Sequence, residues 1–331
     1  MLSVNLVYGT YGESGVLTSI NNTKRMLCSL ERDGVRFYEN SWRVCDVLHA
    51  HTFGPVALLF VLVYKARRRA VIIHAHTTPQ DVKKSYVGAG LFSRFLKYYL
   101  RLYYNLADIC IAPSNYTKEL LSQTLHIKGR IEVLSNGIDL DSFRCTEVRA
   151  MRFKKQQALS GRPLVMSVGF VFIRKGIRDF IEAARELPDY DFVWVGRVLP
   201  SALLPRDTWR MLTNTPRNVR FTGRVESVCD PLSAADVFVF PSYEENQGIV
   251  ALEASACALP IVLRDLPVYA EYIHETNCLK FSTHQEFVAA IDTLVRDRAK
   301  ASVLGENAKE MAQSHDLRLL SKQLLHIYNT A

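Results

Sequence analysis

Long apolar runs are absent from this chain of 331 residues. The longest run covers residues 56–63 and ends before Lys65, whereas a helix that crosses a bilayer needs about 20 apolar residues. Residues 1–8 read as a strand and show neither the basic segment nor the cleavage site of a secretory leader. We therefore expect a cytoplasmic protein without a membrane-spanning segment.

Closely spaced cysteines are also absent. The seven cysteines are scattered, and no C-x-x-C pair occurs among them. An odd number at scattered spacing favours reduced thiols over disulfides or a zinc site. With 48% hydrophobic residues the composition is that of a packed globular protein, and the length suits two domains.

Acidic residues are scarce in one segment. Between Lys65 and Arg101 lie nine basic side chains and a single acid, Asp81, and this excess equals the net charge of +8 of the whole chain. A basic surface on an otherwise neutral body indicates an anionic partner. Nucleic acid is the less favoured partner, because no recognised binding motif accompanies the charge.

Short apolar strands alternate with amphipathic helices along the whole chain. We expect strands at 3–8, 36–39, 44–49, 70–74, 109–112, 131–134, 164–168, 192–195, 219–221, 237–240, 261–263 and 279–281, with helices between most of them. This alternation predicts an α/β protein with two Rossmann-like, doubly wound parallel-sheet domains facing across a cleft. The boundary is expected in a polar linker at 139–161, which gives domains 1–145 and 146–315, and a last helix in 316–331 is expected to pack back on the first domain.

Two loops of the second half carry charges suited to a diphosphate. Glu245 follows the strand 237–240, and Glu253 lies inside the helix that opens near Gly248. Backbone N–H groups at a helix N-terminus bind anions, and carboxylates accept hydrogen bonds from sugar hydroxyls. In the other loop, Arg174 and Lys175 follow the strand 164–168 and precede a helix, where they would neutralise a leaving diphosphate. The alternative to a diphosphate site is purely structural. One glutamate would cap the helix, the other would be exposed, and the two cations would be solvated.

Two H-x-H pairs end strands of the first half: His49 with His51, and His74 with His76. Strand alternation points both histidines of a pair the same way, which raises the possibility of zinc, but no Cys or Glu cluster accompanies them and we do not expect a metal there. A glycine loop at 9–15 follows the first strand and lacks the G-x-G-x-x-G spacing of a dinucleotide site. That absence weighs against a nicotinamide-dependent oxidoreductase.

The segment 241–250 holds Glu245, seven residues separate Glu245 from Glu253, and this pattern resembles the E-x7-E motif of retaining glycosyltransferases of family GT4 with the GT-B fold. Together with 264–269 it is similar to the branch that makes glucosyl-diacylglycerol in bacteria. The resemblance covers the whole chain and implies the following roles. Glu245 binds the donor sugar, Glu253 the ribose, the backbone of Asn246, Gln247, Gly248 and Ile249 the diphosphate, and Val225 the uracil, while Gly12, Gly15 and Gly169 line the donor site and His76 supports the reacting centre.

The resemblance is incomplete at one position. Many members carry Arg where this chain has Phe170, so Arg174 beside Lys175 is expected to replace it. The fold needs no metal to hold the diphosphate, and the D-x-D sequence at Asp139 and Asp141 falls in the linker. We therefore expect no metal and no cofactor, with the nucleotide sugar as substrate.

A basic, aromatic helix is expected at 86–106. Arg94, Lys97 and Arg101 recur at three- and four-residue spacing among aromatic residues, which is typical of a helix that lies on a membrane surface. Lys83 and Lys84 extend the basic surface, and Asp81 is a candidate acceptor contact. A core helix with a solvated basic stripe is the alternative.

These expectations combine into a hexosyltransferase that docks peripherally on the inner face of the cell membrane. It would move glucose from UDP-glucose to diacylglycerol with retention of the α-anomer. The rival acceptors are a glucosylated lipid, a polyprenyl carrier and a polysaccharide precursor, and a catalytically silent membrane-binding protein is the rival from another class. The oligomeric state stays open.

Overall fold

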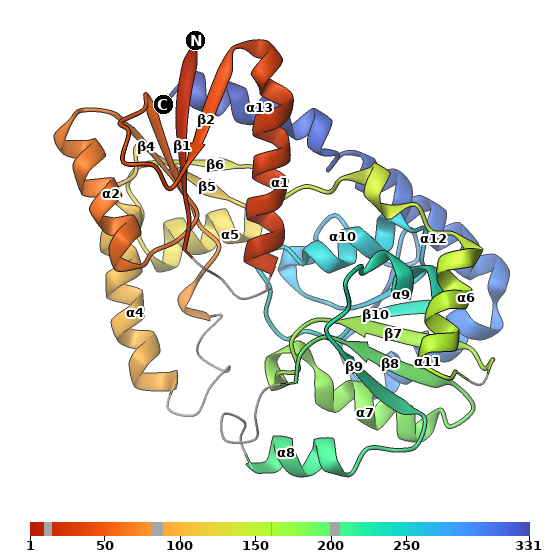
Figure 1. Ribbon diagram of the computed structural model, residues 1–331. Helices are drawn as coiled ribbons and strands as arrows, with labels where there is room; N and C mark the ends of the chain where they lie inside the picture. The colour runs from red at the N-terminus through yellow and green to blue at the C-terminus, as the bar shows by residue number, and fades with distance from the viewer. Residues whose placement is uncertain (10–14, 81–88, 160, 199–205) are drawn as a thin grey trace. The chain divides into compact units, whose positions relative to one another are not determined.

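The structure is a computed structural model that describes residues 1–9, 15–80, 89–159, 161–198 and 206–331. The described chain divides into two compact units (Figure 1). Unit 1 holds the described residues up to Ile138 together with His315–Ala331, and unit 2 holds those from Asp139 to Ser314.

Unit 1 is built on a six-stranded parallel sheet in the order β2-β1-β3-β4-β5-β6. Its elements are β1 (Leu2–Val7), α1 (Gly15–Leu30), β2 (Val35–Glu39), β3 (Val47–Ala50), α2 (Pro55–Ala66), β4 (Ala70–His74), α4 (Ala89–Tyr104), β5 (Ile109–Ala112), α5 (Asn115–Glu119), β6 (Arg130–Val133) and α13 (Leu317–Asn329). Helices α1 and α13 pack on one face, against Val4, Leu6 and Ile72. Helices α2 and α4 pack on the other, against Val71 and Ile73, because successive strand residues face opposite ways.

The last helix belongs to unit 1 because its apolar side is buried there. Leu320 and Leu324 of α13 share a core with Leu27 of α1. The turn at Asn136 and Gly137 lies against both helices: Asn22 donates hydrogen bonds to both carbonyls, and a Cβ on Gly137 would lie 2.4 Å from a Leu317 methyl. The chain therefore leaves unit 1 after Ile138, seven residues before the predicted end of the first domain.

Unit 2 repeats the architecture with the strand order β12-β11-β10-β7-β8-β9. Its strands are β7 (Leu164–Val168), β8 (Asp191–Val195), β9 (Val219–Gly223), β10 (Val237–Phe240), β11 (Ile261–Arg264) and β12 (Leu279–Phe281). Its helices are α6 (Glu147–Gln156), α7 (Ile177–Glu186), α8 (Arg206–Thr213), α9 (Cys229–Ala234), α10 (Ile249–Ala256), α11 (His284–Arg296) and α12 (Arg298–Gln313). Helices α7, α8 and α11 pack on one face, α6, α9 and α10 pack on the other, and α12 contributes side chains to both cores.

The polar segment 139–161, in which the sequence predicts the domain boundary and no helix, contains a helix. Helix α6 forms inside it, since the Thr146 hydroxyl accepts a hydrogen bond from the Arg149 N–H at its first turn. Phe153 is the residue of α6 that is buried, and it joins the core beneath α9. A helix with so narrow an apolar side is hard to recognise from periodicity.

All twelve predicted strands are present, within three residues at each end, and both sheets are parallel throughout. In such sheets ligands bind at the carboxyl ends of the strands where the strand order reverses. That point lies between β7 and β10 in unit 2 and between β1 and β3 in unit 1. Lys175 and Glu245 follow the two strands of the reversal point in unit 2, and His51 follows β3 in unit 1.

Candidate functional site

The reversal point of unit 2 brings the two charged loops together. Lys175, which follows β7, forms an ion pair with Glu245, which follows β10. Both side chains are largely buried. Arg174 reaches the same loop and donates from Nη1 to the Glu244 carbonyl at 2.8 Å. The structure thus joins three of the predicted catalytic residues of unit 2 and excludes two independently solvated cations.

The charge state of Glu245 depends on this pairing. Burial alone would raise the pKa of the carboxyl, but the Lys175 and Arg174 cations outweigh burial and hold the pKa below its usual value. Glu245 is therefore a carboxylate at neutral pH, and it can accept hydrogen bonds from hydroxyl groups.

Glycine permits the close approach of the two loops. Gly176 has a positive φ of 79°, and a Cβ there would lie 2.2 Å from the Pro241 carbonyl oxygen. The Tyr243 N–H donates to the Arg174 carbonyl at 2.8 Å, which ties the loops backbone to backbone. Any side chain at Gly176 would separate Lys175 from Glu245.

Helix α10 begins immediately after the second loop. Its N-cap is Gly248 in a left-handed conformation, and no side chain of the described residues caps it. The Gly248 backbone lies over the Tyr269 ring, since an added Cβ would be 3.0 Å from it. Asn246 and Gln247 are half-buried in the preceding turn, and Ile249 is buried at the helix start. The opening of α10 is therefore a backbone surface suited to an anion.

Glu253 lies inside α10 and is buried, so it is not the exposed glutamate of the alternative interpretation. Burial, and secondly the Cys229 thiolate, raise the pKa of its carboxyl to about 8. Glu253 is thus largely protonated at neutral pH, whereas Glu245 is charged. The two carboxyl groups of the motif are chemically distinct.

The remaining donor-site predictions lie on neighbouring loops of unit 2. Gly169 follows β7 with a φ of 148°, and its carbonyl accepts a hydrogen bond from the Trp194 indole at 2.8 Å. A Cβ on Gly196, after β8, would lie 2.0 Å from that carbonyl. Val225 follows β9 and is half-buried against the core. These loops all extend from the carboxyl ends of strands, as the nucleotide site of this sheet type requires.

Three residues that sequence reasoning missed hold the Glu245 loop. Arg264, the last residue of β11, pairs with Asp179 of α7 at 3.0 Å and stacks over the Tyr243 ring at 3.9 Å. The Tyr243 hydroxyl donates to Asp179 at 2.9 Å. Arg264 also donates to the Pro241 carbonyl at 3.2 Å. The sequence signal was a cation at a strand end, but its partner lies 85 residues away.

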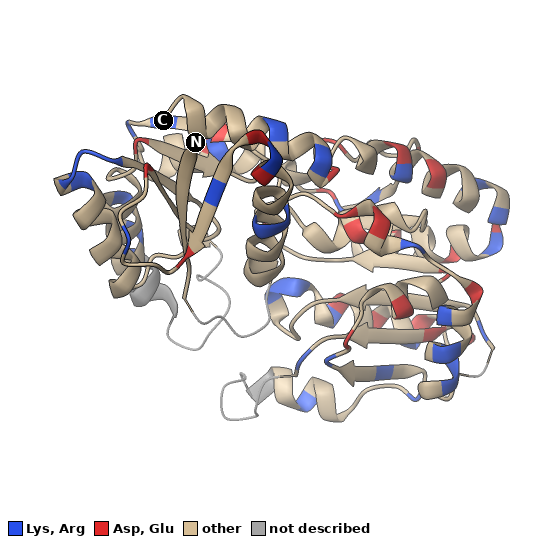
Figure 2. Cartoon of the chain, turned by 45° about the horizontal axis from the view of Figure 1, so that its top comes forward, with Lys and Arg blue, Asp and Glu red and all other residues tan. Residues whose placement is uncertain are grey.

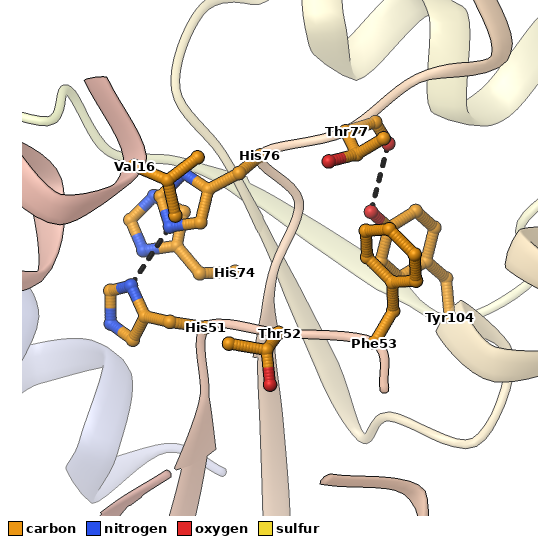
Figure 3. Close-up of a pocket in the computed structure, with 8 residues that line it drawn as sticks. All are labelled: Val16, His51, Thr52, Phe53, His74, His76, Thr77 and Tyr104. Atoms are coloured by element: carbon orange, nitrogen blue, oxygen red, sulfur yellow. Dashed lines mark hydrogen bonds between the residues drawn. The ribbon is translucent and has the colours of Figure 1, made fainter. Parts of the chain in front are cut away.

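In unit 1 the two H-x-H pairs form one stack of four imidazoles, of which Figure 3 shows His51, His74 and His76. His51 Nδ1 and His76 Nε2 are 2.8 Å apart, and His49 Nδ1 lies 2.8 Å from the Tyr328 hydroxyl. Burial lowers the pKa of His49 and His76 to about 3, and it holds the pKa of His51 and His74 well below the usual range. All four rings are neutral at physiological pH. His76 is the half-buried member and lines a small pocket with Thr77 and Tyr104.

Several predicted residues of unit 1 cannot be placed beside this stack. Gly12, Asp81, Lys83 and Lys84 lie outside the described residues. Gly15 begins α1 and is exposed. Their proposed roles stay predictions.

The predicted amphipathic helix is α4, and its outer side is apolar as well as basic. Phe95, Tyr98 and Leu102 are 72%, 60% and 72% exposed, while Arg94 is exposed and Lys97 and Arg101 are half-exposed. Helix α2 adds a second exposed apolar side that the sequence analysis did not assign: Val56, Leu59 and Leu62. The basic turn 67–69 follows α2 (Figure 2). Within the described residues, no helix is both long and apolar enough to cross a bilayer.

Cysteines that are far apart in the sequence meet in unit 2. The sulfur atoms of Cys145, Cys229 and Cys257 lie within 4.8 Å of one another. A hydrogen bond with Cys257 lowers the pKa of Cys229 to about 6. Spacing along the chain gave no sign of this group.

Two family models match the chain. Residues 34–142 match glycosyltransferase family 4, and residues 149–311 match glycosyl transferases group 1. The processive diacylglycerol alpha-glucosyltransferase of Acholeplasma laidlawii is 31% identical over 96% of this chain and 93% of its own length. The alpha-galactosylglucosyldiacylglycerol synthase of Streptococcus pneumoniae is 26% identical over 95% and 85%.

Solved structures share the fold. Anabaena HepE in complex with UDP and glucose is similar over the full length of both chains, with a TM-score of 0.79 and 19% sequence identity. WaaG, a glycosyltransferase of lipopolysaccharide biosynthesis, gives a TM-score of 0.72 at 19% identity. The predicted pair of Rossmann-like domains is thereby confirmed.

Proposed function

This chain belongs to glycosyltransferase family 4, and from that premise we propose that it transfers glucose from UDP-glucose to diacylglycerol, with retention of the α-anomer. The observation that carries the proposal is the buried Lys175–Glu245 pair at the reversal point of unit 2. A solvent-shielded cation beside a carboxylate suits a donor that is a diphosphate at one end and a polyol at the other.

Each charged group of unit 2 has a part in this proposal. The Glu245 carboxylate accepts hydrogen bonds from the hydroxyls of the hexose. Lys175 and Arg174 stabilise the negative charge that grows on the departing UDP, and the backbone at 246–249 holds the diphosphate at the start of α10. Because these cations supply the positive charge, we propose that the diphosphate is held without a metal ion and that the enzyme uses no cofactor.

Glu253 suits the ribose because it is largely neutral. A protonated carboxyl both donates and accepts a hydrogen bond, so it can pair with two adjacent hydroxyls. Gly169 follows β7 and Val225 follows β9, so both lie at the carboxyl edge of the sheet of unit 2, and we propose that they contact the nucleotide. His76 of unit 1 is proposed to support the reacting carbon of the sugar as a neutral imidazole.

The outer side of α4 supports a membrane as the site of action. Phe95, Tyr98 and Leu102 recur at intervals of three and four residues, so they form one apolar stripe, and Arg94, Lys97 and Arg101 lie on the same helix. Cations near an anionic bilayer contribute on the order of 1 kcal/mol each, and buried apolar side chains add to that. We propose that unit 1 docks on the inner face of the cell membrane, where the acceptor resides.

The test is a transfer assay with purified protein, UDP-glucose and anionic vesicles that contain one acceptor at a time. Diacylglycerol, glucosyl-diacylglycerol and a polyprenyl phosphate form the panel, and products are separated by thin-layer chromatography. We expect a monoglucosyl lipid from diacylglycerol. Product from another acceptor alone would refute the acceptor and retain the enzyme class, and no product from any of them would refute the proposal.

A further inference from the structure

The buried imidazoles of unit 1 have nitrogen atoms that nothing in the described chain satisfies. His49 Nε2, His51 Nε2 and both ring nitrogens of His74 are buried and have no hydrogen-bond partner among the described residues. Buried polar atoms are paired in nearly all native structures, so four orphaned nitrogens in one cluster need an explanation such as an ion or a water.

The same three rings have the spacing of a ligand set. One ring nitrogen from each of His49, His51 and His74 lies within 4.8 Å of the other two. Nitrogen atoms around a tetrahedral zinc ion, at bond lengths of about 2.0 Å, are about 3.3 Å apart. Ligation would therefore require the three rings to move closer together than they lie in the structure.

Other hydrogen bonds orient two of these rings for ligation through Nε2. A neutral imidazole that binds a metal through Nε2 carries its proton on Nδ1, and that N–H is normally held by an outer partner. His49 Nδ1 is 2.8 Å from the Tyr328 hydroxyl, and His51 Nδ1 is 2.8 Å from His76 Nε2. In both rings the atom left without a partner is the one that would bind the ion.

A small cavity of about 10 Å³ adjoins the stack, lined by His51, His74 and His76 together with Thr52 and Thr77 (Figure 3). That volume suits a single small occupant. A cation that binds one nitrogen of each ring would satisfy three of the four unpartnered atoms at once.

From this geometry we infer that His49, His51 and His74 form a binding site for a divalent transition-metal ion of the zinc class. The three ligands are neutral nitrogens, and the group contains no carboxylate, which disfavours magnesium and calcium. Three histidines leave a fourth position for water. This site is made of residues of unit 1, and the chemistry proposed for the diphosphate loops of unit 2 does not require it.

The ion would link two strands of the sheet and, through a hydrogen bond, the last helix of the chain. His49 belongs to β3 and His74 to β4, and Tyr328, the outer partner of His49, belongs to α13. An ion that binds only the folded arrangement stabilises it by mass action, so the thermal midpoint of unfolding should rise with zinc concentration.

The test uses the full chain without a polyhistidine tag, stripped with a chelator and titrated with Zn²⁺ or Co²⁺. We expect one equivalent by elemental analysis and the visible absorption of four-coordinate Co²⁺. His74→Gln should abolish this binding, and Tyr328→Phe should weaken it about 10- to 100-fold. His326→Gln, which changes an exposed histidine of α13, is the matched control and should bind as the parent does.

X-ray absorption of the zinc-loaded parent protein keeps the inference falsifiable if His74→Gln does not fold. Three nitrogen scatterers at about 2.0 Å would support the site. Sulfur scatterers at about 2.3 Å would place the ion on the Cys145, Cys229 and Cys257 group and overturn it. Failure of the parent to retain either metal would leave only a water in the cavity and would also overturn it.

Discussion

The two units share a six-stranded parallel sheet but differ in strand order, and the charges at their candidate sites differ as well. At the reversal point of unit 2 the side chains are charged and paired: Lys175 with Glu245, and Arg264 with Asp179. In unit 1, the ends of β3 and β4 carry four histidines that burial keeps neutral, and the positive charge lies outside on the surface of α2 and α4. The comparison teaches that the sheet fixes where a site lies, whereas the side chains on its loops decide what it binds.

Removing the buried cation of unit 2 should have the largest effect. Lys175→Met removes the ion-pair partner of the Glu245 carboxylate, and it removes a positive charge that would stabilise the leaving diphosphate. We therefore expect turnover to fall about 10²- to 10³-fold. Lys155→Met, at an exposed position of α6, is the control. Steady-state kinetics with UDP-glucose measure both variants, and equal rates would show that the charged site is not the donor site.

Forcing the two loops of unit 2 apart should destabilise that unit. Gly176→Ala places a Cβ 2.2 Å from the Pro241 carbonyl oxygen at a φ of 79°, and such strain costs on the order of 1–3 kcal/mol or more. Gly161 has a similar φ of 84°, but a Cβ there would meet open space. Gly161→Ala therefore measures the cost of the backbone conformation without the steric clash. Urea unfolding should show the larger loss for Gly176→Ala; the reverse order would contradict the close loop contact.

Charging the surface of unit 1 should weaken membrane binding and leave the donor site intact. Leu102→Asp, on the exposed stripe of α4, should reduce binding to anionic vesicles about tenfold or more, since it loses apolar burial and adds repulsion. Val303→Asp, an exposed apolar position of unit 2, should change little. Vesicle sedimentation measures membrane binding, and UDP titration measures donor binding. If Leu102→Asp lost both, membrane binding by unit 1 and donor binding by unit 2 would not be separate functions.

The pH dependence of the free energy of unfolding should reflect the buried carboxyl of Glu253. Its folded pKa of about 8 exceeds the ordinary value of 4.5, so the unfolded chain loses this proton first as pH rises. The free energy of unfolding should therefore decline between pH 4.5 and 8 on account of this group. Glu253→Gln should flatten that part of the profile, and an unchanged slope would mean that the carboxyl is not buried in its neutral form.

Much of the fold and of the candidate site could be predicted from the sequence, because the patterns that indicate them span only a few residues. The twelve strands, the two glutamates with seven residues between them and the cations before α7 all depend on short-range patterns. The H-x-H pairs were equally visible, but each pair alone shows only two rings. Convergence of His49 and His74 requires β3 and β4 to be neighbours, which only the sheet order decides.

What the sequence did not show depends on long-range contacts. Asp179 and Arg264 look like surface charges until the fold pairs them across Tyr243. The Cys145, Cys229 and Cys257 group joins a linker residue to two helices and has no spacing signature. Helix α6 has one buried side chain, Phe153, so its amphipathic pattern was too weak to recognise.

The central claim, glucosyl transfer to diacylglycerol by the charged site of unit 2, is tested most directly in a host that makes no glucolipids. The chain and its Glu245→Gln variant are expressed there, and the extracted lipids are analysed by mass spectrometry, with NMR of the anomeric proton. We predict α-glucosyl-diacylglycerol with the parent chain and at most a trace with the variant. Absence of any new glucolipid, or equal amounts from both chains, would contradict the account.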